Sequence, residues 1–288
     1  MPATILLIGA TGTIGGKLMQ DLAPDHAAGT LIVKAGARSP RSRQSIEQAG
    51  LSAVNFDLDD PETFDTALQG VDRIFLLRPY KLRQLMHGKL VTDAARRVGV
   101  NHIVNLSAYG RQDTPWSVIG WNFLVEAYIE RSGVGYTHLQ PNYFMDNILA
   151  QWSRETDTLV NRLQAPVSWI AAADIAAGAA AVLRNPAAYA GKTYPLAAEA
   201  ASPDQIAAML TDITGRPHKV TIPDQERMMR GLLAQGREPD YAQALIDYLN
   251  AVSRGAVPEV ADIFNTVEEV TGRPALRFKD FLAQHVKT

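Results

Sequence analysis

Two hydrophobic patterns alternate along the first half of the chain. Short, continuous apolar runs are typical of buried strands, and the stretches between them place apolar residues at helical spacing. This regular alternation predicts a doubly wound parallel α/β sheet. The predicted strands are residues 4–8, 31–38, 52–58, 71–77, 102–106 and 136–139.

The first apolar run breaks into a glycine-rich turn that leads into an amphipathic helix, with Ile14, Leu18 and Leu22 at helical spacing. Glycines let the backbone approach a diphosphate without Cβ collision, and the N–H groups of the first helical turn face negative charge. Glycines also end strands and cap helices for structural reasons alone. We predict that this turn binds the pyrophosphate of a dinucleotide through Gly9, Thr11, Gly12, Thr13, Ile14 and Gly15.

The end of the second predicted strand indicates which dinucleotide is bound. In a dinucleotide fold this strand end lies beside the adenosine ribose, where an acid accepts from a 2′-hydroxyl and a base neutralises a 2′-phosphate. Arg38 and Ser39 stand here, followed by Arg41 and Arg43, with no acid among them. A guanidinium suits phosphate geometry, so NADP(H) is favoured over NAD. The alternative is a solvated basic loop, which applies most to Arg41 and Arg43.

Further cofactor contacts are expected at other strand ends, because ligands of such sheets bind beyond the carboxyl ends of the strands. Asp57 and Leu58 would lie near the adenine edge, although Asp57 could equally form a turn. Leu77 and Arg78 would line the cofactor trough. The residues after the sixth strand can wall a nicotinamide pocket or pack under a loop. They are Pro141, Asn142, Tyr143 and Phe144.

After about residue 150 the alternation weakens. An apolar run at 167–170, an alanine-rich helix over 174–183 and a run at 192–196 predict that the chain returns once to finish the sheet. From Ser202, which opens a capping box with Gln205, helical signals dominate.

These patterns divide the chain into two parts. We expect an NADP-binding Rossmann domain over 1–150 and a C-terminal substrate lobe, smaller and mostly helical, over 151–288, with about 167–197 returning to complete the Rossmann sheet. An apolar cluster over 228–233 predicts core packing or a substrate lid.

Composition excludes several classes of function. The 288 residues carry a formal charge of -2, which gives no electrostatic footprint for nucleic acid or an anionic membrane. Without cysteine there is no thiolate catalysis, disulfide or cysteine-bound metal, and no histidine has the spacing of a metal ligand. The longest apolar stretch, 169–183, is interrupted by Asp174 and is too short to cross a bilayer. We expect a soluble cytoplasmic protein, a monomer or homodimer, that acts on a small molecule and holds no metal.

Four features in this order resemble the NmrA-like branch of the atypical short-chain dehydrogenases/reductases. They are residues 9–15, Arg38 at a strand end, residues 104–108, and residues 132–137 followed by 141–147. The resemblance extends over nearly the whole chain. It implies a Rossmann domain with a smaller C-terminal lobe that binds NADP(H), either in a reductase of quinones, dyes, phenolic ethers or imines, or in a regulator that binds the dinucleotide without turning it over.

The chain departs from this family at the residues that transfer protons. No tyrosine is followed four residues later by lysine, and no lysine lies between Lys89 and Lys192. Proton donation by a tuned tyrosine and lysine pair is therefore excluded. Asn122 stands four residues before Glu126, at the position where some quinone-reductase-like relatives carry histidine.

Hydride transfer requires that the protein place the acceptor and stabilise the developing charge. A quinone, a conjugated imine or a dye delocalises that charge and needs no strong acid. For a plain carbonyl, the candidate donors are Ser107 and Tyr109, with Asn122 orienting the ribose, the carboxamide or a water. Their structural alternatives are a strand-ending hydroxyl, a half-buried ring and a helix-surface amide, respectively.

Two functions remain open from the sequence. The first is an NADPH-dependent reductase that transfers a hydride to a small conjugated or aromatic acceptor, such as a quinone, imine, dye or carbonyl compound, without a tyrosine and lysine pair. The second is a non-catalytic NADP(H)-binding redox sensor that acts through a protein partner. A closable pocket over the nicotinamide would count against the sensor, which has no use for one.

Overall fold

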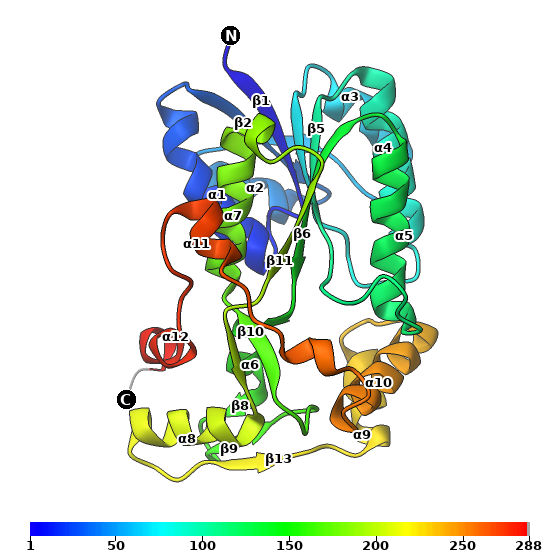
Figure 1. Cartoon of the computed structure of the whole chain (residues 1–288). Coiled ribbons are helices and arrows are strands. Elements are labelled where there is room, and N and C mark those ends of the chain that lie inside the picture. Colours follow the sequence, from blue (N-terminus) through cyan, green and yellow to red (C-terminus); the bar gives the residue numbers. More distant parts are fainter. Residues whose placement is uncertain (287–288) are drawn as a thin grey trace.

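Seven parallel strands form the central sheet of the computed structural model, which describes residues 1–286 (Figure 1). Their spatial order is β11-β6-β5-β4-β1-β2-β3, so the chain changes direction across the sheet between the neighbours β1 and β4. The prediction of a doubly wound parallel α/β sheet is confirmed. The strands are β1 (Ala3–Ile8), β2 (Leu31–Ala37), β3 (Ser52–Asn55), β4 (Arg73–Leu76), β5 (His102–Leu106), β6 (Gly135–Pro141) and β11 (Lys192–Leu196).

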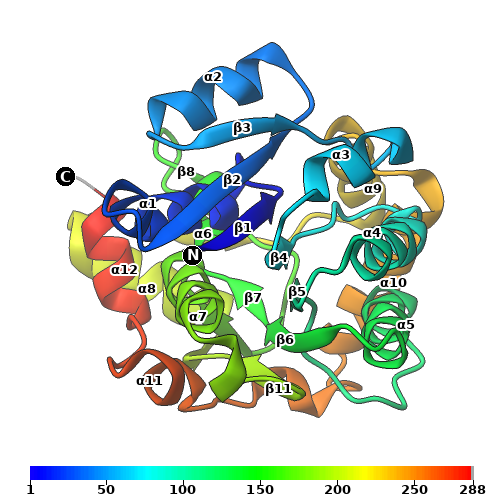
Figure 2. The same cartoon turned by 90° about the horizontal axis from the view of Figure 1, so that it is seen from above.

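Both faces of this sheet are covered by helices, which explains why its strands read as continuous apolar runs (Figure 2). Ile5 and Leu7 belong to the apolar cluster on one face, and Leu6 and Ile8 to the cluster on the other. The first face packs against α1 (Thr13–Ala27), α2 (Pro40–Gln48) and α7 (Ala172–Arg184). The second packs against α3 (Phe64–Leu68), which follows the short η1 (Pro61–Thr63), and against α4 (Gln84–Val98) and α5 (Ser117–Arg131).

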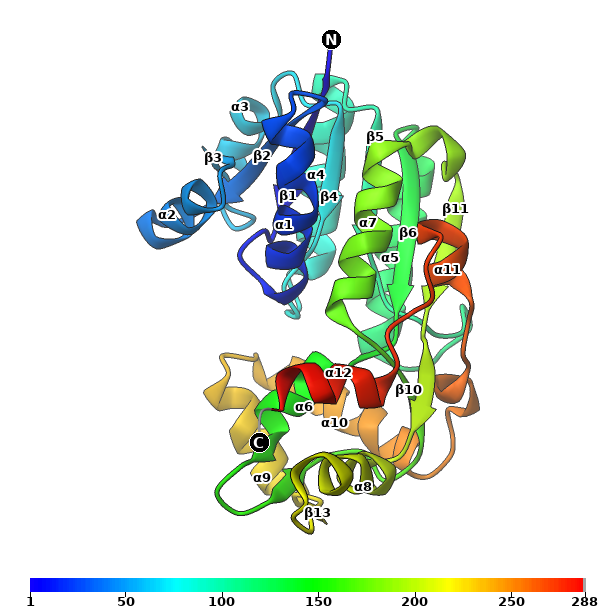
Figure 3. The ribbon, with the colours of Figure 1, turned by 90° about the vertical axis from the view of Figure 1, so that its left-hand side faces the viewer.

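A smaller, mainly helical part lies beyond the carboxyl ends of the central strands (Figures 1 and 3). Its apolar core centres on Trp169, whose ring lies 5.7 Å from that of Tyr143 and 5.4 Å from that of Phe278. The helices are α6 (Asp146–Gln151), α8 (Pro203–Thr214), α9 (Gln225–Ala234), α10 (Pro239–Ser253), η3 (Pro258–Ala261) and α12 (Phe278–His285). Two small sheets join them: β7 (Tyr143–Phe144) with β10 (Val167–Ile170) and β12 (Glu199–Ala201), and β8 (Trp152–Ser153) with β9 (Thr158–Val160) and β13 (Lys219–Thr221).

The chain crosses between the two parts more often than its hydrophobic pattern indicates. The segment 172–196 returns as α7, the short η2 (Pro186–Ala188) and β11, which pairs with β6 at the edge of the central sheet. β10 differs from the expectation, because it pairs with β7 and β12 in a separate sheet. A later segment, α11 (Thr266–Thr271), comes back once more to pack on α7. An apolar run marks a buried strand but does not identify its partner strand.

The carboxylate of Asp174 fastens the last part of the chain to the first turn of α7. It accepts hydrogen bonds from Arg273 Nη1 and from the backbone N–H of Leu276, both at 2.8 Å. The Asp174 side chain is only 1% exposed whereas that of Arg273 is 48% exposed, so loss of the carboxylate would remove the acceptor of two hydrogen bonds whose donors are partly accessible to water.

We predict that Asp174→Ala lowers the free energy of unfolding by about 1–3 kcal/mol, because it removes a buried carboxylate that accepts two hydrogen bonds, one of them from a half-exposed arginine. The matched control is Asp212→Ala, which removes an exposed pair with Lys279 at 3.0 Å and should cost less than about 1 kcal/mol. Urea denaturation followed by circular dichroism measures both. If the two variants lose the same free energy of unfolding, the contacts of Asp174 stabilise the protein no more than an exposed ion pair does.

Candidate functional site

The glycine turn between β1 and α1 is packed so tightly that one of its positions has no room for a side chain. A Cβ on Gly15 would lie 2.2 Å from the carbonyl oxygen of Gly9, which itself has φ of 80°. This contact brings the start of α1 against the end of β1. The turn has this shape because only glycine tolerates both conditions.

The outer side of the same turn is open. Gly12 caps α1 with extended backbone, no side chain caps the helix, and Thr11, Gly12 and Thr13 are exposed. The first-turn N–H groups of a helix lack partners within the helix, and Ile14 and Gly15, though buried, supply two of them. The predicted pyrophosphate site therefore has the shape that a diphosphate requires, with free amides at a positive helix end.

Arg38 lies exposed just beyond the end of β2. Its side chain makes no hydrogen bond or ion pair with any other of residues 1–286. Ser39 instead caps α2 in a reciprocal pair with Ser42, and Arg43 donates to the carbonyl oxygen of Ala53 at 3.0 Å. The Arg38 side chain is thus not engaged in the local fold, whereas the side chains of Ser39 and Arg43 stabilise it.

Asp57 and Leu58, expected at the adenine edge, form part of a turn after β3. The Asp57 carboxylate accepts from the backbone N–H of Asp59 at 3.0 Å, the turn-forming alternative for this residue. Leu58 packs at the margin of the apolar cluster on the α4 side of the sheet. Leu77 lies against the glycine turn, since a Cβ on Gly9 would come within 3.0 Å of its Cδ2.

Arg78 is buried beneath the strand ends instead of lining an open trough. Its Nη2 lies within hydrogen-bond distance of Asn105 Oδ1 and the Leu106 carbonyl, both at 3.2 Å, and of Asn122 Oδ1 at 3.3 Å. The arginine is 6% exposed, and burial lowers its pKa to about 10. Within residues 1–286 its Nε and Nη1 have no hydrogen-bond partner. A sequence pattern cannot show this, because the residues that cover Arg78 come from β5 and α5.

The three candidate catalytic residues differ in how free their polar groups are. Asn122 is buried and its amide is engaged, because Nδ2 donates to the Val118 carbonyl at 3.0 Å and Oδ1 faces Arg78. The Tyr109 hydroxyl donates to Asp262 at 2.6 Å, and burial together with Asp262 raises the pKa of Tyr109 well above its usual value. Ser107 Oγ is buried and, in the described part of the chain, has no partner by hydrogen-bond geometry. The hydroxyl lies close to the buried carboxylate of Glu126, where it lowers a Glu126 pKa that burial raises, and it is the least engaged of the three candidate donors.

A cavity of about 1150 Å³ lies between the ends of β5 and β6 and the helices α9 and α10. Several predicted site residues line it together, whereas the glycine turn and Arg38 lie outside it, at the ends of β1 and β2. The predicted residues in its wall are Ser107, Tyr109, Asn122, Pro141, Asn142, Tyr143 and Phe144.

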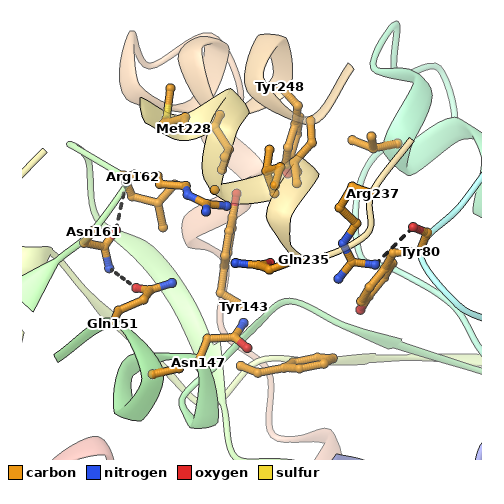
Figure 4. A pocket seen from close by; sticks show the side chains of 18 of the residues that line it. Tyr80, Tyr143, Asn147, Gln151, Asn161, Arg162, Met228, Gln235, Arg237 and Tyr248 are labelled. Atoms are coloured by element: carbon orange, nitrogen blue, oxygen red, sulfur yellow. Dashed lines mark hydrogen bonds between the residues drawn. The ribbon is translucent and has the colours of Figure 1, made fainter. Parts of the chain in front are cut away.

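Apart from Met228, the opposite wall of this cavity consists of residues that the sequence analysis did not single out (Figure 4). They come from the loop after β4, from α6, from the segment after β9, and from α9 and α10. Arginines and amides on irregular segments carry no periodic signal, and only the apolar cluster at 228–233 indicated a possible lid. These residues include Tyr80, Asn147, Gln151, Asn161, Arg162, Met228, Gln235, Arg237, Tyr241 and Tyr248.

Neither a metal site nor a membrane-spanning helix is present in the described residues. Residues 1–286 contain no group of three or more histidine and carboxylate side chains placed to hold a metal ion. Within the same range, none of the helices is long and apolar enough to cross a membrane.

The strand order, the open glycine turn and the cavity at the strand ends define a Rossmann protein with a ligand site next to its dinucleotide crevice. Within that class, the chain belongs to the NmrA-like family, whose family model matches residues 1–249. The family predicted from the motifs is therefore confirmed.

Several relatives that resemble this chain over nearly its whole length are reductases. It is 32% identical to the NAD(P)H azoreductase of Xenophilus azovorans, with 98% of this chain and 97% of the relative covered. It is 31% identical to the (4-alkanoyl-5-oxo-2,5-dihydrofuran-3-yl)methyl phosphate reductase of Streptomyces griseus, with 98% of each covered. The crystal structure of an NADPH-dependent quinone oxidoreductase from Escherichia coli is 25% identical and superposes with a TM-score of 0.79, over 98% of this chain and 99% of that one.

We predict that Gly15→Ala weakens NADPH binding by at least ~10-fold, because the new Cβ displaces the turn that would bind the pyrophosphate. A tenfold weaker dissociation constant corresponds to a loss of about 1.4 kcal/mol of binding free energy. The control is Gly16→Ala, where a Cβ meets nothing within 4 Å. That variant should bind NADPH normally and unfold at a slightly higher temperature, since alanine favours the helix. Calorimetric titration and thermal denaturation measure both effects, and unchanged NADPH affinity in Gly15→Ala would contradict the proposed pyrophosphate contact.

We predict that Arg38→Ala weakens NADPH binding by ~10-fold or more while leaving NADH binding within about twofold. The reason is that a guanidinium on a 2′-phosphate is a charge-assisted contact that NADH cannot make. Arg38→Ala serves as its own control, because a general effect on folding would change the dissociation constants of NADPH and NADH alike and leave their ratio unchanged. A ratio equal to that of the unmodified protein would remove Arg38 from the cofactor site.

Proposed function

We propose that this protein transfers a hydride from NADPH to a small conjugated or aromatic acceptor. The single observation that carries the proposal is the cavity at the ends of β5 and β6, which adjoins the dinucleotide crevice and is large enough for a multi-ring compound. An NAD(P)H-dependent reductase is also what the family and its full-length relatives support.

The residues present fit an NADP(H) cofactor at two points. The open amides of the glycine turn would hold the pyrophosphate, and Arg38 would meet the 2′-phosphate. The nicotinamide, when bound, supplies the hydride. Pro141, Asn142 and Phe144, at the end of β6, would then separate the cofactor from the acceptor cavity.

The lining of the cavity favours an acceptor that delocalises charge. Among the described residues that line it there is no histidine, lysine or carboxylate, so no strong acid is at hand for protonation. The Ser107 hydroxyl would donate a hydrogen bond to the atom on which negative charge develops. The reduced acceptor would take its proton from water. Quinones, azo compounds and conjugated imines meet this requirement, whereas a simple ketone meets it poorly.

The alternative, a redox sensor without turnover, rests on the missing tyrosine and lysine pair. A sensor requires the dinucleotide site and a surface for its partner, but it has no use for a large internal cavity beside the nicotinamide position. The cavity therefore favours the reductase.

The experiment is to add purified protein and NADPH, without oxygen, to a panel of quinones, azo dyes, imines and aldehydes. We predict saturable oxidation of NADPH with at least one conjugated acceptor and little or none with simple aldehydes, because only the former spread the charge. NADPH binding, measured separately by calorimetry, controls for an inactive preparation. Tight NADPH binding with no turnover across the panel would overturn the reductase in favour of the sensor.

A further inference from the structure

We propose that Arg162 binds an anionic group carried by the acceptor, a carboxylate, a sulfonate or a phosphate monoester, while Arg237 adds positive charge from the facing wall of the cavity. This inference rests on the proposed function for the acceptor itself, and it specifies the chemical class of that acceptor. The observation that supports the inference is the distribution of charged side chains around the cavity.

The charged side chains that line the cavity are all positive. Four arginines contribute to its wall, and within the described residues no aspartate or glutamate does. One of the four, Arg230, is compensated on the surface of α9 by an ion pair with Glu226. Arg227 lies exposed near it on the same helix. The remaining two, Arg162 and Arg237, lie deeper and come from different segments of the chain.

Arg162 is the cation whose charge is least compensated. It is half-buried, and its side chain has no hydrogen bond or ion pair with any other of residues 1–286. Its Nη2 would lie 3.5 Å from a Cβ on Gly231, so the guanidinium is held between the segment after β9 and the backbone of α9. Burial lowers the pKa of Arg162, and the charge of Arg237 lowers it further. The negative charge of an anion bound at Arg162 would offset both effects.

Arg237 is fixed in place by Tyr80. Its Nη1 donates to the Tyr80 carbonyl at 3.0 Å, and its guanidinium lies 5.2 Å from the centre of the Tyr80 ring. Figure 4 shows the side chains of Arg162 and Arg237 on opposite sides of the cavity, with Tyr143 and Gln235 between them. A positioned arginine costs less side-chain entropy when it binds a ligand, so Arg237 is preorganised for an anion.

The same cavity offers aromatic surface for the rest of such a ligand. Tyr143, Trp169, Tyr241 and Tyr248 all line it. The Tyr143 hydroxyl is buried next to that of Tyr248. A flat conjugated acceptor would pack on these rings while its anionic substituent pairs with the planar guanidinium fork of Arg162. An ammonium or other cationic acceptor would be repelled by the arginines of this wall.

The test uses two azo dyes that differ by one negative charge: para methyl red, which carries a carboxylate, and its methyl ester. With the unmodified protein we expect the KM for the carboxylate to be at least ~10-fold below that for the ester, and to rise with ionic strength while the KM for the ester does not. Arg162→Met should raise the KM for the carboxylate ~10-fold and leave that for the ester within about twofold. Arg162→Lys should lie between, since it keeps the charge and loses the fork.

The matched control is Arg254→Met, which removes one exposed positive charge at the end of α10, outside the cavity wall. It should leave the preference for the carboxylate as it is. Arg162→Lys also serves if Arg162→Met unfolds, which thermal denaturation would show. Equal KM values for the two dyes, or equal effects of Arg162→Met on both, would overturn the anion site and leave the reductase standing.

A second readout separates this inference from the proposed function. If neither dye is reduced, the carboxylate dye is titrated calorimetrically into the protein saturated with NADP⁺. Binding that weakens with salt and is lost in Arg162→Met supports the anion site, even though the reductase assignment would then fail for these dyes. Absence of such binding overturns the anion site.

Discussion

One close backbone contact determines how the rest of the site can be arranged. Because Gly15 leaves no space between the start of α1 and the Gly9 carbonyl, the helix begins directly at the end of β1. Its amino terminus therefore points across the carboxyl edge of the sheet, beside the gap between β1 and β4 where the strand order reverses. Open α/β sheets bind ligands in this crevice. The cavity at β5 and β6 lies further along the same edge, as a substrate site must if it is to face the end of a bound dinucleotide.

The local sequence pattern was sufficient to predict the strands of the central sheet and the turn that follows the first of them. Continuous apolar runs and helical spacing predicted the six strands up to β6, and the glycine spacing predicted the turn before α1. Element ends were less accurate: β3 ends at Asn55 and not at 58, and β4 begins at Arg73 and not at 71. The pairing of β10 could not be predicted, since strands in any of the sheets need similar apolar residues.

The candidate site likewise contains residues that the sequence could predict and residues that only the folded structure reveals. Residues at strand ends, such as Ser107 and Tyr143, could be predicted to lie at one edge because parallel strands end together. Arg78 also follows a strand, but three groups from β5 and α5 bury it, and only the folded structure reveals them. Arg162 and Arg237 lie on irregular segments far apart in sequence, where no spacing rule applies. These arginines stand out because no carboxylate lines the cavity with them, and the absence of a nearby counter-charge can be seen only in the folded structure.

The repeated crossing of the chain has a consequence for engineering. The part that forms the cavity wall is built from stretches on both sides of α7 and β11, and α7 packs on α1 while β11 extends the central sheet. A hybrid made by joining the first 150 residues to the remainder of another family member would import that member's edge strand and its helix on α1. Transplanting substrate preference into this scaffold is therefore better done by grafting discrete wall segments, such as α9 with the loop that follows it, than by exchanging halves.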